Sequence, residues 1–570
     1  MLECKGLATE AYEELEGILG SEHVSREPAI LDSYAWQPAV NLATQPWIPR
    51  PAAVALPGST EEVQQVVRAC NRHQVKYKAH STGWAAFGGP GEEGVVQIDL
   101  RRMNRILEID EQNQFAVVEP YVCCSQLQAE AMKRGLNCHI IGAGPNTSQL
   151  ASVTSGWGYG WTGIYTGFGG RNPLGVEWVL PDGEILRLGS PGSGSGWFCG
   201  DGPGPSLRGI MRGWGGAQGG LGVFTKCAVK LYPWPNGPRS PRVSGILSDV
   251  STEDVPATHK VYWVFSPSYE KFADLAYEIG NAEIGYLHCK GAVGALFGLL
   301  APRAMKKLLS SPASRAILKA FQHMTLLMLA AHTEREFAYQ EKVLRKLVAE
   351  TDSILLDTSH LPFHGSFWWG LNRSIYPAMA FRPGGSFITS MGSSAEYDCC
   401  VQQARLGESI KQEYIDNGTF LDDLGDCTWG GIYEGTSNWG HLEEIAMFDR
   451  RAGRPEEARV AFLNATTEAT IDRALGFGLS SLEHGMYKRL GPLMGDYHLW
   501  QAKIKQAFDP NNVSDASHYI PPIDVLRTEM AETGCGTDAA GKGSEPPVAR
   551  RPVPRTDEAS SGGTKPGPSS

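Results

Sequence analysis

The stretches HSTGWAAFGG (residues 80–89) and GAQGGLGVFTK (residues 216–226) decide the fold of this chain. Both are rich in small side chains, which let the backbone approach a bound group closely. A loop of this kind can direct several amide N–H groups at one anion, and it suits a pyrophosphate. We therefore predict that the two stretches form two backbone walls of a single dinucleotide site.

Regular elements precede the first stretch. Ser59 or Thr60 can cap a helix in which apolar residues recur at helical spacing, and VKYKA (75–79) predicts a short strand. The strand leads directly into the glycine-rich loop, so the loop is held at the end of a regular element.

Further strands and turns follow. Alternating apolar runs predict strands within 95–110 and 115–122, and 125–135 predicts a short helix. A third glycine-rich passage covers 142–170, and PDG at 181–183 predicts a hairpin turn between two strands. No G-x-G-x-x-G opens a helix after a strand with an acidic residue about 20 positions later, which argues against a Rossmann domain.

The composition is that of a globular chain. With 570 residues, 42% of them hydrophobic and 20% charged, the chain is long enough for two cores. Its formal net charge of -11 provides no basic surface field, so we expect no nucleic-acid partner and expect backbone dipoles to hold a dinucleotide.

The cysteines and the N-terminus bear on redox chemistry and location. None of the twelve cysteines forms a C-x-x-C pair, so we expect no iron–sulfur cluster and interpret the cysteines as reduced buried thiols. The first residues indicate a short acidic helix without a basic or apolar leader, and no stretch reaches about 18 apolar residues. We expect a cytoplasmic protein.

An ordered series of motifs resembles one family. The series runs through PGSTEEVQQVVR (57–68), IDLRRMNRI (98–106), SGWGYG (155–160), GVEWVLPDGEIL (175–186) and GPSLRGIMRGWGGAQGGLGVFTK (204–226). It resembles the vanillyl-alcohol oxidase and p-cresol methylhydroxylase superfamily of FAD enzymes, which includes the flavoproteins of D-lactate and glycolate oxidation. The resemblance implies an α+β fold, with a two-subdomain FAD-binding PCMH-type domain and an antiparallel-sheet cap that holds the substrate.

The resemblance also implies domain boundaries. The FAD-binding domain would cover 50–238 and would be completed by a returning segment, 481–525. The cap would cover 239–480. An N-terminal helical segment (1–49) precedes these parts, and a Gly, Pro and Ser-rich tail (526–570) is expected to be disordered.

Cofactor-binding residues follow from the same resemblance. They fall on the first loop, the third glycine-rich passage and the end of the second stretch, where N–H donors would stabilise a reduced flavin. The predicted FAD contacts are His80, Ser81, Thr82, Gly83, Trp84, Ala85, Thr154, Ser155, Gly158, Tyr159, Gly160, Gly222 and Val223. Val223 would act through its amide, and Gly222 would not readily accept a Cβ. Because Trp84 stands where one branch carries its flavin-linking histidine, we expect FAD without a covalent link through residues 80–89.

The resemblance places the chemistry near the C-terminus. His484 is the expected base, with Glu483 beside it and Tyr487 as a further catalytic residue. The substrate candidates are Lys488, Arg382 and His441. His441 and two further histidines, His360 and His364, are interpreted as surface-loop residues, and we expect no catalytic metal because no good ligand spacing occurs.

The cap sequence predicts its own elements. Residues 260–266 predict a strand, and 268–281 and 334–350 predict helices. Aromatic residues in 367–385 and 426–435 could line a pocket or fill the core. The segment 291–331 is apolar and basic and suits either peripheral membrane contact, a partner subunit, or a pair of core helices, of which we favour the helices.

These observations together predict an FAD-dependent oxidoreductase. It would oxidise an alcohol, alkylphenol or hydroxy acid by hydride transfer to flavin N5, with electrons passing to oxygen or to an iron–sulfur protein, a cytochrome or an electron-transferring flavoprotein. The alternatives are a D-2-hydroxy-acid dehydrogenase and a flavin-bearing electron-relay subunit without its own substrate. A homodimer would fit the family.

Overall fold

A computed structural model gives the fold of most of the chain. For strands 387–395 and 428–430 it describes the backbone alone. The described residues are 6–35, 47–83, 88–142, 144–155, 158–197, 201, 206–211, 216–245, 250–291, 310–374, 387–424, 428–430, 438, 440–447, 455–473, 475 and 486–532.

A four-stranded sheet forms the first subdomain. Its strand order is β1 (Val24–Ser25), β2 (Ala53–Ala55), β4 (Val96–Asp99) and β3 (Tyr77–His80), with β2, β4 and β3 parallel. Helix α3 (Thr60–His73) covers this sheet. Ser59 is its cap, because its Oγ accepts a hydrogen bond of 3.1 Å from Glu62 N–H.

A five-stranded antiparallel sheet forms the second subdomain. Its order is β5 (Ile106–Asp110), β6 (Phe115–Val118), β10 (Val223–Lys230), β8 (Pro173–Val179) and β9 (Ile185–Leu188). The hairpin turn predicted at PDG joins β8 and β9, and Gly183 adopts φ 84° there. A two-stranded ribbon pairs β7 (Leu136–Asn137) with β11 (Tyr232–Pro233).

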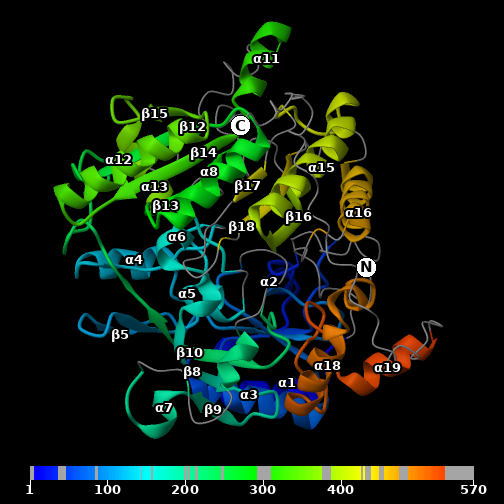
Figure 1. Ribbon diagram of the computed structural model, residues 1–570. Coiled ribbons are helices and arrows are strands. Elements are labelled where there is room, and N and C mark those ends of the chain that lie inside the picture. The colour runs from blue at the N-terminus through cyan, green and yellow to red at the C-terminus, as the bar shows by residue number, and fades with distance from the viewer. Residues whose placement is uncertain are drawn as a thin grey trace, which may run out of the picture.

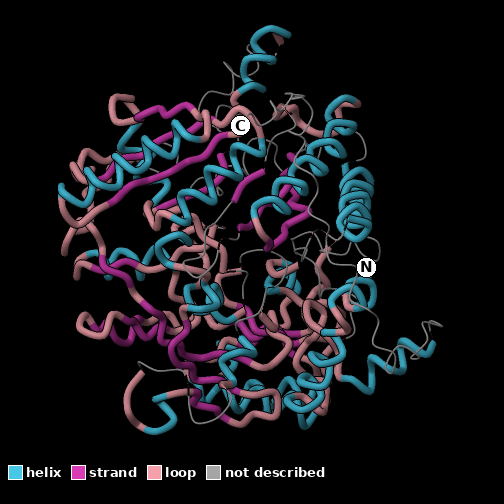
Figure 2. The backbone as a smooth tube through the Cα atoms, in the orientation of Figure 1, coloured by secondary structure: helices cyan, strands magenta, loops and turns pink. Residues whose placement is uncertain are grey.

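The cap is built on a seven-stranded sheet in which every neighbouring pair is antiparallel. In Figures 1 and 2 it occupies the upper part of the molecule, above the two smaller sheets. Its order is β15 (Ile354–Asp357), β12 (His259–Phe265), β14 (Met324–Ala330), β13 (Leu287–Gly291), β17 (Thr428–Gly430), β18 (Gly440–Met447) and β16 (Phe387–Ala395). The predicted α+β fold with an antiparallel cap sheet is confirmed.

The helices complete the two parts. Those of the lower part and the returning C-terminal segment are α1 (Thr9–Leu19), α2 (Pro28–Asp32), α4 (Cys124–Met132), α5 (Gln149–Thr154), α6 (Gly163–Thr166), α7 (Ser190–Ser193), α17 (Tyr487–Leu490), α18 (Tyr497–Phe508) and α19 (Ile523–Glu532). Those of the cap are α8 (Tyr269–Asn281), α11 (Pro312–Ala320), α12 (Glu334–Glu350), α13 (His364–Asn372), α15 (Tyr397–Asp416) and α16 (Pro455–Arg473).

The two faces of the cap sheet bury different partners. Tyr262 and Val264 of β12 pack with α8 and α12, whereas Val261 and Trp263 point to the opposite face. On that opposite face they meet α13 and aromatic residues of the lower part. The aromatic passage that could have lined a pocket is core in its described half, since Trp368 is fully buried there.

The segment 291–331 differs from the favoured pair of core helices. Its second apolar run is β14, a central strand of the cap sheet, because β-branched and long apolar side chains can be buried on both faces of a covered sheet. Helix α11 has no buried residue and projects from the top of the molecule (Figure 1). Among the described helices none is both long and apolar enough to cross a membrane.

The C-terminal segment returns to the first subdomain. Tyr77 of β3 donates its N–H to Val513 O and accepts at its carbonyl from Asp515 N–H, both at 2.9 Å. Residues 513–515 therefore continue the four-stranded sheet beyond β3, and Phe508 of α18 stacks on Trp178 of β8, with ring centroids 5.4 Å apart.

Candidate cofactor site

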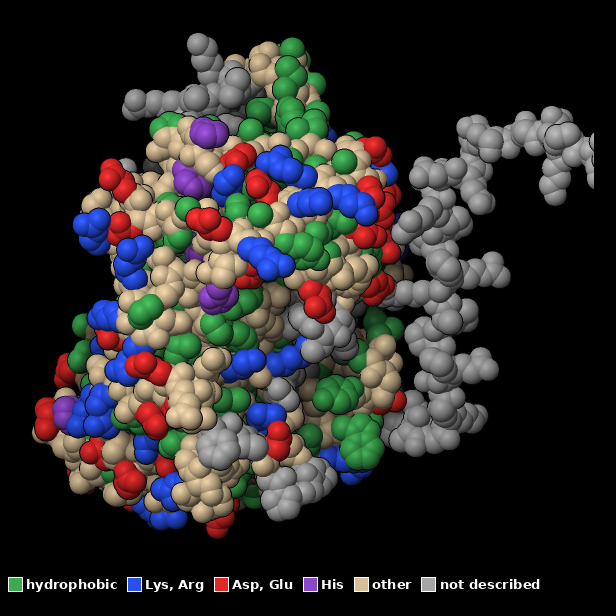
Figure 3. Space-filling view, turned by 60° about the vertical axis from the view of Figure 1, so that its left-hand side comes forward, with side chains coloured by type: hydrophobic (Ala, Val, Ile, Leu, Met, Phe, Trp, Pro, Cys, Tyr) green, Lys and Arg blue, Asp and Glu red, His purple; other side chains and the backbone are tan. Residues whose placement is uncertain are grey.

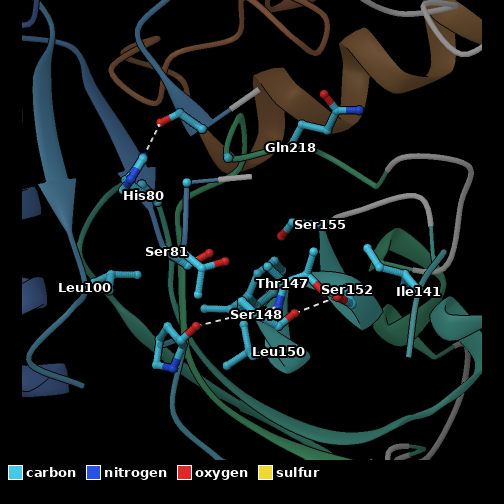
Figure 4. Close-up of a pocket in the computed structure, with 18 of the residues that line it drawn as sticks. His80, Ser81, Leu100, Ile141, Thr147, Ser148, Leu150, Ser152, Ser155 and Gln218 are labelled. Carbon is cyan, nitrogen blue, oxygen red and sulfur yellow. Dashed lines mark hydrogen bonds between the residues drawn. The ribbon is translucent and has the colours of Figure 1, made fainter. Parts of the chain in front are cut away.

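A cavity lies where the two subdomains face each other. About 930 Å³ of it is free of protein atoms, part of this open to solvent. Figure 4 shows its walls: the end of β3 on one side, the segment around α5 on another, and the loop at Gln218 above. The lining residues are Ala79, His80, Ser81, Thr82, Gly83, Gly88, Leu100, Pro120, Ile141, Thr147, Ser148, Leu150, Ala151, Ser152, Ser155, Gln218, Gly219, Gly222 and Phe224.

The first wall is the loop that leaves β3. Gly88 O, where the loop returns, accepts hydrogen bonds from His80 Nδ1 at 3.1 Å and from Gln97 Nε2 at 3.0 Å. Burial lowers the pKa of His80, so the ring holds the loop in its neutral form. Within the described residues, no hydrogen bond engages the hydroxyls or amide N–H groups of Ser81 and Thr82.

The second wall is a run of hydroxyl side chains around α5. Ser148 caps the helix by accepting from Ala151 N–H at 3.0 Å, and its own hydroxyl donates to Pro120 O at 2.5 Å. Ser152 donates to Ser148 O at 2.6 Å. These bonds fix α5 against the turn after β6, and the wall is polar without carrying charge.

The third wall is the loop 216–222, whose carbonyl groups are held from behind. Four successive carbonyl oxygens accept hydrogen bonds from buried side chains of other segments. Gln218 O accepts from Lys78 Nζ at 2.7 Å, Gly219 O from Ser514 Oγ at 2.8 Å, Gly220 O from Lys505 Nζ at 2.7 Å, and Leu221 O from Trp178 Nε1 at 2.7 Å.

No charged side chain lines the cavity within the described residues. Two fully buried lysines, Lys78 and Lys505, lie directly behind the third wall. Burial lowers the pKa of Lys505 to about 8, and the neighbouring carboxylate of Asp509 opposes that shift. The site therefore presents backbone and hydroxyl groups to a ligand while its ammonium groups stay out of reach.

The structure brings some predicted cofactor residues together and places others behind the walls. His80, Ser81, Thr82, Gly83, Ser155 and Gly222 line the cavity. Thr154 does not, since its hydroxyl bonds back to Leu150 O at 2.9 Å. Val223 is buried in the core of the first subdomain. Gly222 has φ +91°, and a Cβ on it would lie 2.3 Å from Val179 O, so its intolerance of a side chain comes from packing.

Gly158, Tyr159 and Gly160 form a layer behind the second wall. Tyr159 O accepts a hydrogen bond of 2.6 Å from Gly142 N–H, next to the lining residue Ile141. Buried His139 holds the same layer, because its ring nitrogens lie 2.8 Å from Gly158 O and 2.8 Å from Thr166 Oγ1.

The cap reaches this layer through His441. The interpretation of His441 as a surface-loop residue is wrong, because it lies on β18 and is only 3% exposed. Its ring stacks on Tyr159, with centroids 4.4 Å apart and planes inclined by 15°. Its Nε2 lies 2.6 Å from Glu443 Oε1. Residues 441 and 443 share one face of the strand, which is the face toward the cavity-bearing domain.

The expected C-terminal catalytic residues are not brought to the cavity in the described chain. Tyr487 Oη donates to Glu529 at 3.3 Å, and Lys488 Nζ lies 2.9 Å from the same carboxylate. Both residues thus face α19. The remaining predicted residues, Trp84, Ala85, Arg382, Glu483 and His484, lie outside the described residues.

The described His, Cys, Asp and Glu side chains bear on metal binding and on disulfides. No group of three or more His, Cys, Asp or Glu side chains in the described segments is placed to hold a metal ion. The described cysteines are free thiols, and all but Cys123 are buried.

Sequence reasoning missed the residues that hold the third wall. Lys78 and Ser514 are separated in sequence from the loop they bind, and no local pattern joins them. The available signal was a lysine in the buried strand YKAH and the turn sequence DPNN at 509–512. Thr147, Ser148 and Ser152 were missed because the predicted contacts began at Thr154.

The cavity fits the chemistry of FAD. Free amide and hydroxyl donors at Ser81 and Thr82 suit a pyrophosphate, and glycines at 83, 88, 219 and 222 leave the walls without side chains. The long lining from β3 to α5 suits an extended dinucleotide.

Comparison with known proteins supports the same cofactor. Residues 51–189 match the family model of the FAD binding domain. The chain is 31% identical over 217 residues to an uncharacterized FAD-linked oxidoreductase of Mycobacterium tuberculosis, covering 38% of this chain and 44% of that protein. It is 30% identical over 241 residues to the flavoprotein subunit of 4-cresol dehydrogenase (hydroxylating) of Pseudomonas putida, covering 40% and 44%. The match thus spans less than half of each relative.

The fold has a solved counterpart. The crystal structure of p-cresol methylhydroxylase with bound substrate superposes with a TM-score of 0.71 at 18% identity, covering 91% of this chain and 98% of that chain. The likeness therefore extends over the cap as well as the cavity-bearing domain, which confirms the predicted fold.

Proposed function

We propose that this chain, whose residues 51–189 belong to the FAD binding domain family, is an FAD-dependent oxidoreductase acting on an alcohol, alkylphenol or hydroxy acid. When bound, the flavin would accept a hydride from the substrate and pass the electrons to oxygen or a redox partner protein. The observation that carries the proposal is the meeting of the cap with the cavity-bearing domain at His441 and Tyr159.

His441 and Glu443 are the residues to which we assign proton transfer. A carboxylate 2.6 Å from a ring nitrogen holds the imidazole in one orientation and stabilises the imidazolium formed when the ring takes a proton. In this scheme His441 accepts the proton of the substrate hydroxyl and Glu443 orients the ring. Tyr159 stacks against the ring, and its carbonyl accepts a hydrogen bond from Gly142 N–H, beside the lining residue Ile141, so it links His441 to the cavity wall.

The sequence offers a second base, His484, with Glu483 beside it. Lys488 is less suited to a substrate carboxylate, because Glu529 occupies its ammonium group. Arg382 is the remaining cation proposed for a hydroxy acid. The two histidines therefore compete for one role, and substitution separates them.

An anaerobic flavin titration tests the proposal. The purified protein is loaded with FAD, freed of excess cofactor, and mixed with 4-alkylphenols, aryl alcohols and D-2-hydroxy acids while flavin absorbance is followed. One class should bleach the flavin. Its rate should fall about 100-fold in His441→Asn, within the range for loss of a general base, and less in Glu443→Gln.

The same titration has three contrary outcomes. A large loss in His484→Asn with none in His441→Asn assigns the base to the C-terminal segment. Flavin that stays oxidised with every compound, but is reduced by a partner protein, indicates an electron-relay subunit. A protein that binds no FAD contradicts the proposed function.

A redox partner is part of the proposal. The relative from Pseudomonas putida is the flavoprotein subunit of its enzyme, and this chain has no C-x-x-C pair for a cluster of its own. Electrons would then leave to oxygen, an iron–sulfur protein, a cytochrome or an electron-transferring flavoprotein. Reoxidation rates of the reduced protein in air and with each acceptor distinguish these cases.

A peripheral membrane contact through α11 is also proposed, with the protein otherwise cytoplasmic. Residues 291–331 carry five Lys or Arg and no Asp or Glu, in a chain of net charge -11. Ile317 of α11 is 61% exposed, and Figure 3 shows hydrophobic side chains along this projection. Apolar and basic side chains together suit an anionic lipid surface. Flotation with anionic and neutral vesicles tests this: wild type should bind anionic vesicles only, and Ile317→Glu should not bind.

A further inference from the structure

The loop 216–222 is held by side chains that belong neither to it nor to the cavity surface. Its carbonyls at 218, 219 and 220 accept from Lys78, Ser514 and Lys505, at 2.7, 2.8 and 2.7 Å. Lys78 lies on β3, and the other two residues come from the returning C-terminal segment. Two segments more than 400 residues apart therefore meet on one wall of the proposed flavin site.

The bonds determine where the amide N–H groups of the loop point. In a trans peptide unit the N–H points opposite to the C=O. Gln218 O faces Lys78, so the N–H of Gly219 points away from Lys78, and Gly219 lines the cavity. Gly220 N–H is used within the loop on Ala217 O, and Gly222 N–H donates to Ser514 Oγ. No partner for Gly219 N–H occurs among the described residues.

We propose that Lys78 and Ser514, with Lys505, are positioning residues that hold the 216–222 loop so that the N–H of Gly219 donates to bound FAD. The inference rests on the proposed function, because it assumes that FAD occupies the cavity. A hydrogen bond from the Lys78 ammonium to Gln218 O also polarises the same peptide unit and strengthens its N–H as a donor.

The charged groups around Lys78, Ser514 and Lys505 support the same role. Asp509 pairs with Lys505 and accepts from Val513 N–H and Ser514 N–H, and Asp515 accepts from Gly91 N–H and Ser517 N–H. The carboxylate of Asp509 thus faces the C-terminal turn, and that of Asp515 lies between this turn and Gly91, while the ammonium groups of Lys78 and Lys505 face the loop. The positive end of this arrangement lies behind the cavity wall, where it favours the more negative, reduced form of a flavin.

The test compares FAD binding in three variants of the full chain. Lys78→Met removes the ammonium group and keeps the aliphatic stem, and Ser514→Ala removes a single hydroxyl. Lys290→Met is the matched control, since Lys290 is also buried and donates to the backbone carbonyls of Gly291 and Gln322 in the cap. The FAD dissociation constant is measured by titrating apoprotein, and the reduction potential by equilibration with a reference dye.

We expect Lys78→Met to weaken FAD binding at least tenfold and Ser514→Ala about fivefold. Reduced FAD should lose about ten times more affinity than oxidised FAD in Lys78→Met, which lowers the two-electron potential by about 30 mV. Lys290→Met should change neither quantity. If Lys78 and Ser514 had only a structural role, the reduction potential would stay unchanged in those variants that still bind FAD.

Each failure has a distinct signature. Wild type that binds no FAD contradicts the proposed function itself. Wild type that binds FAD, with unchanged affinity and potential in Ser514→Ala and in folded Lys78→Met, overturns the positioning role. If Lys78→Met does not fold, Ser514→Ala alone decides, because loss of one hydroxyl leaves the packing of the loop in place.

Discussion

Gly222→Ala should be one of the most costly single substitutions at the cavity. Gly222 has φ +91°, a region in which a side chain costs about 1–2 kcal/mol. The added Cβ would lie 2.3 Å from Val179 O, so the loop and β8 must separate by about 0.7 Å to reach the 3.0 Å below which Cβ contacts essentially never occur. Forced displacement in a packed region costs about 1–3 kcal/mol more.

Gly237→Ala supplies the matched control. Gly237 has φ +67° with no atom within 4 Å of an added Cβ, so it should lose only the backbone part, about 1–2 kcal/mol. Urea unfolding followed by circular dichroism compares the free energies of unfolding of the two variants, provided the slope with denaturant is unchanged. FAD affinity should fall in Gly222→Ala alone, because Gly222 lines the cavity.

If Gly222→Ala unfolds no more readily than Gly237→Ala and binds FAD as wild type does, the contact with Val179 O does not constrain the loop. The close packing of the third wall would then contribute neither to FAD binding nor to stability.

Three further outcomes are expected. Burial raises the pKa of Glu444 from 4.5 to about 8, so the folded chain holds a proton that the unfolded chain has lost, and native stability should fall between those pH values. The thermal midpoint of Glu444→Gln, measured from pH 5 to 8, should not show that fall. The same pH dependence in wild type and in Glu444→Gln would contradict the prediction. His80→Asn should weaken FAD binding about fivefold, the equivalent of about 1 kcal/mol, by releasing Gly88 O, and calorimetric titration measures it. Wild-type affinity should stay level from pH 6.5 to 7, because burial keeps His80 neutral there and Lys505, with a pKa of about 8, stays charged. Removing FAD present at 100 times its dissociation constant should lower the free energy of unfolding by about 2.7 kcal/mol, and an unchanged thermal midpoint would speak against binding.

Much of the fold was predictable because local signals and final structure agree. The helix at 334–350 has the same bounds in the structure, and the strand predicted at 260–266 is β12, shifted by one residue. The spacing of apolar residues in each element follows from which faces are buried. The helix buries one face, and the strand buries both. The PDG turn was predictable for a similar reason, since Gly183 takes the positive φ that the hairpin requires.

The segment 324–331 shows where periodicity fails. MTLLMLAA is apolar at every position, so its sequence does not distinguish a buried helix from a strand covered on both faces. Only the neighbouring strands β12 and β13 decide the matter. His441 was misjudged for the same reason, because its burial depends on Tyr159, which lies far away in sequence.

The segments that form the cavity walls could be predicted from the sequence, but the side chains that hold these walls in place could not. Small residues in 80–89 and 216–226 marked the walls, because a backbone that must approach a ligand excludes side chains. The hydrogen bonds of Lys78 and Lys505 join residues 140 and 285 positions from their carbonyl partners. Such contacts arise only when the chain has closed on itself, and no local pattern encodes them.

The contribution of residues 505–515 to the third wall has a consequence for synthesis. A ribosome releases the two halves of the cavity early, but Lys505, Ser514 and Asp515 emerge only after the whole cap has been translated. A nascent chain halted before that point would display an unfinished pocket. We therefore expect FAD to bind only once this segment has been made, and products truncated before residue 505 to bind FAD poorly.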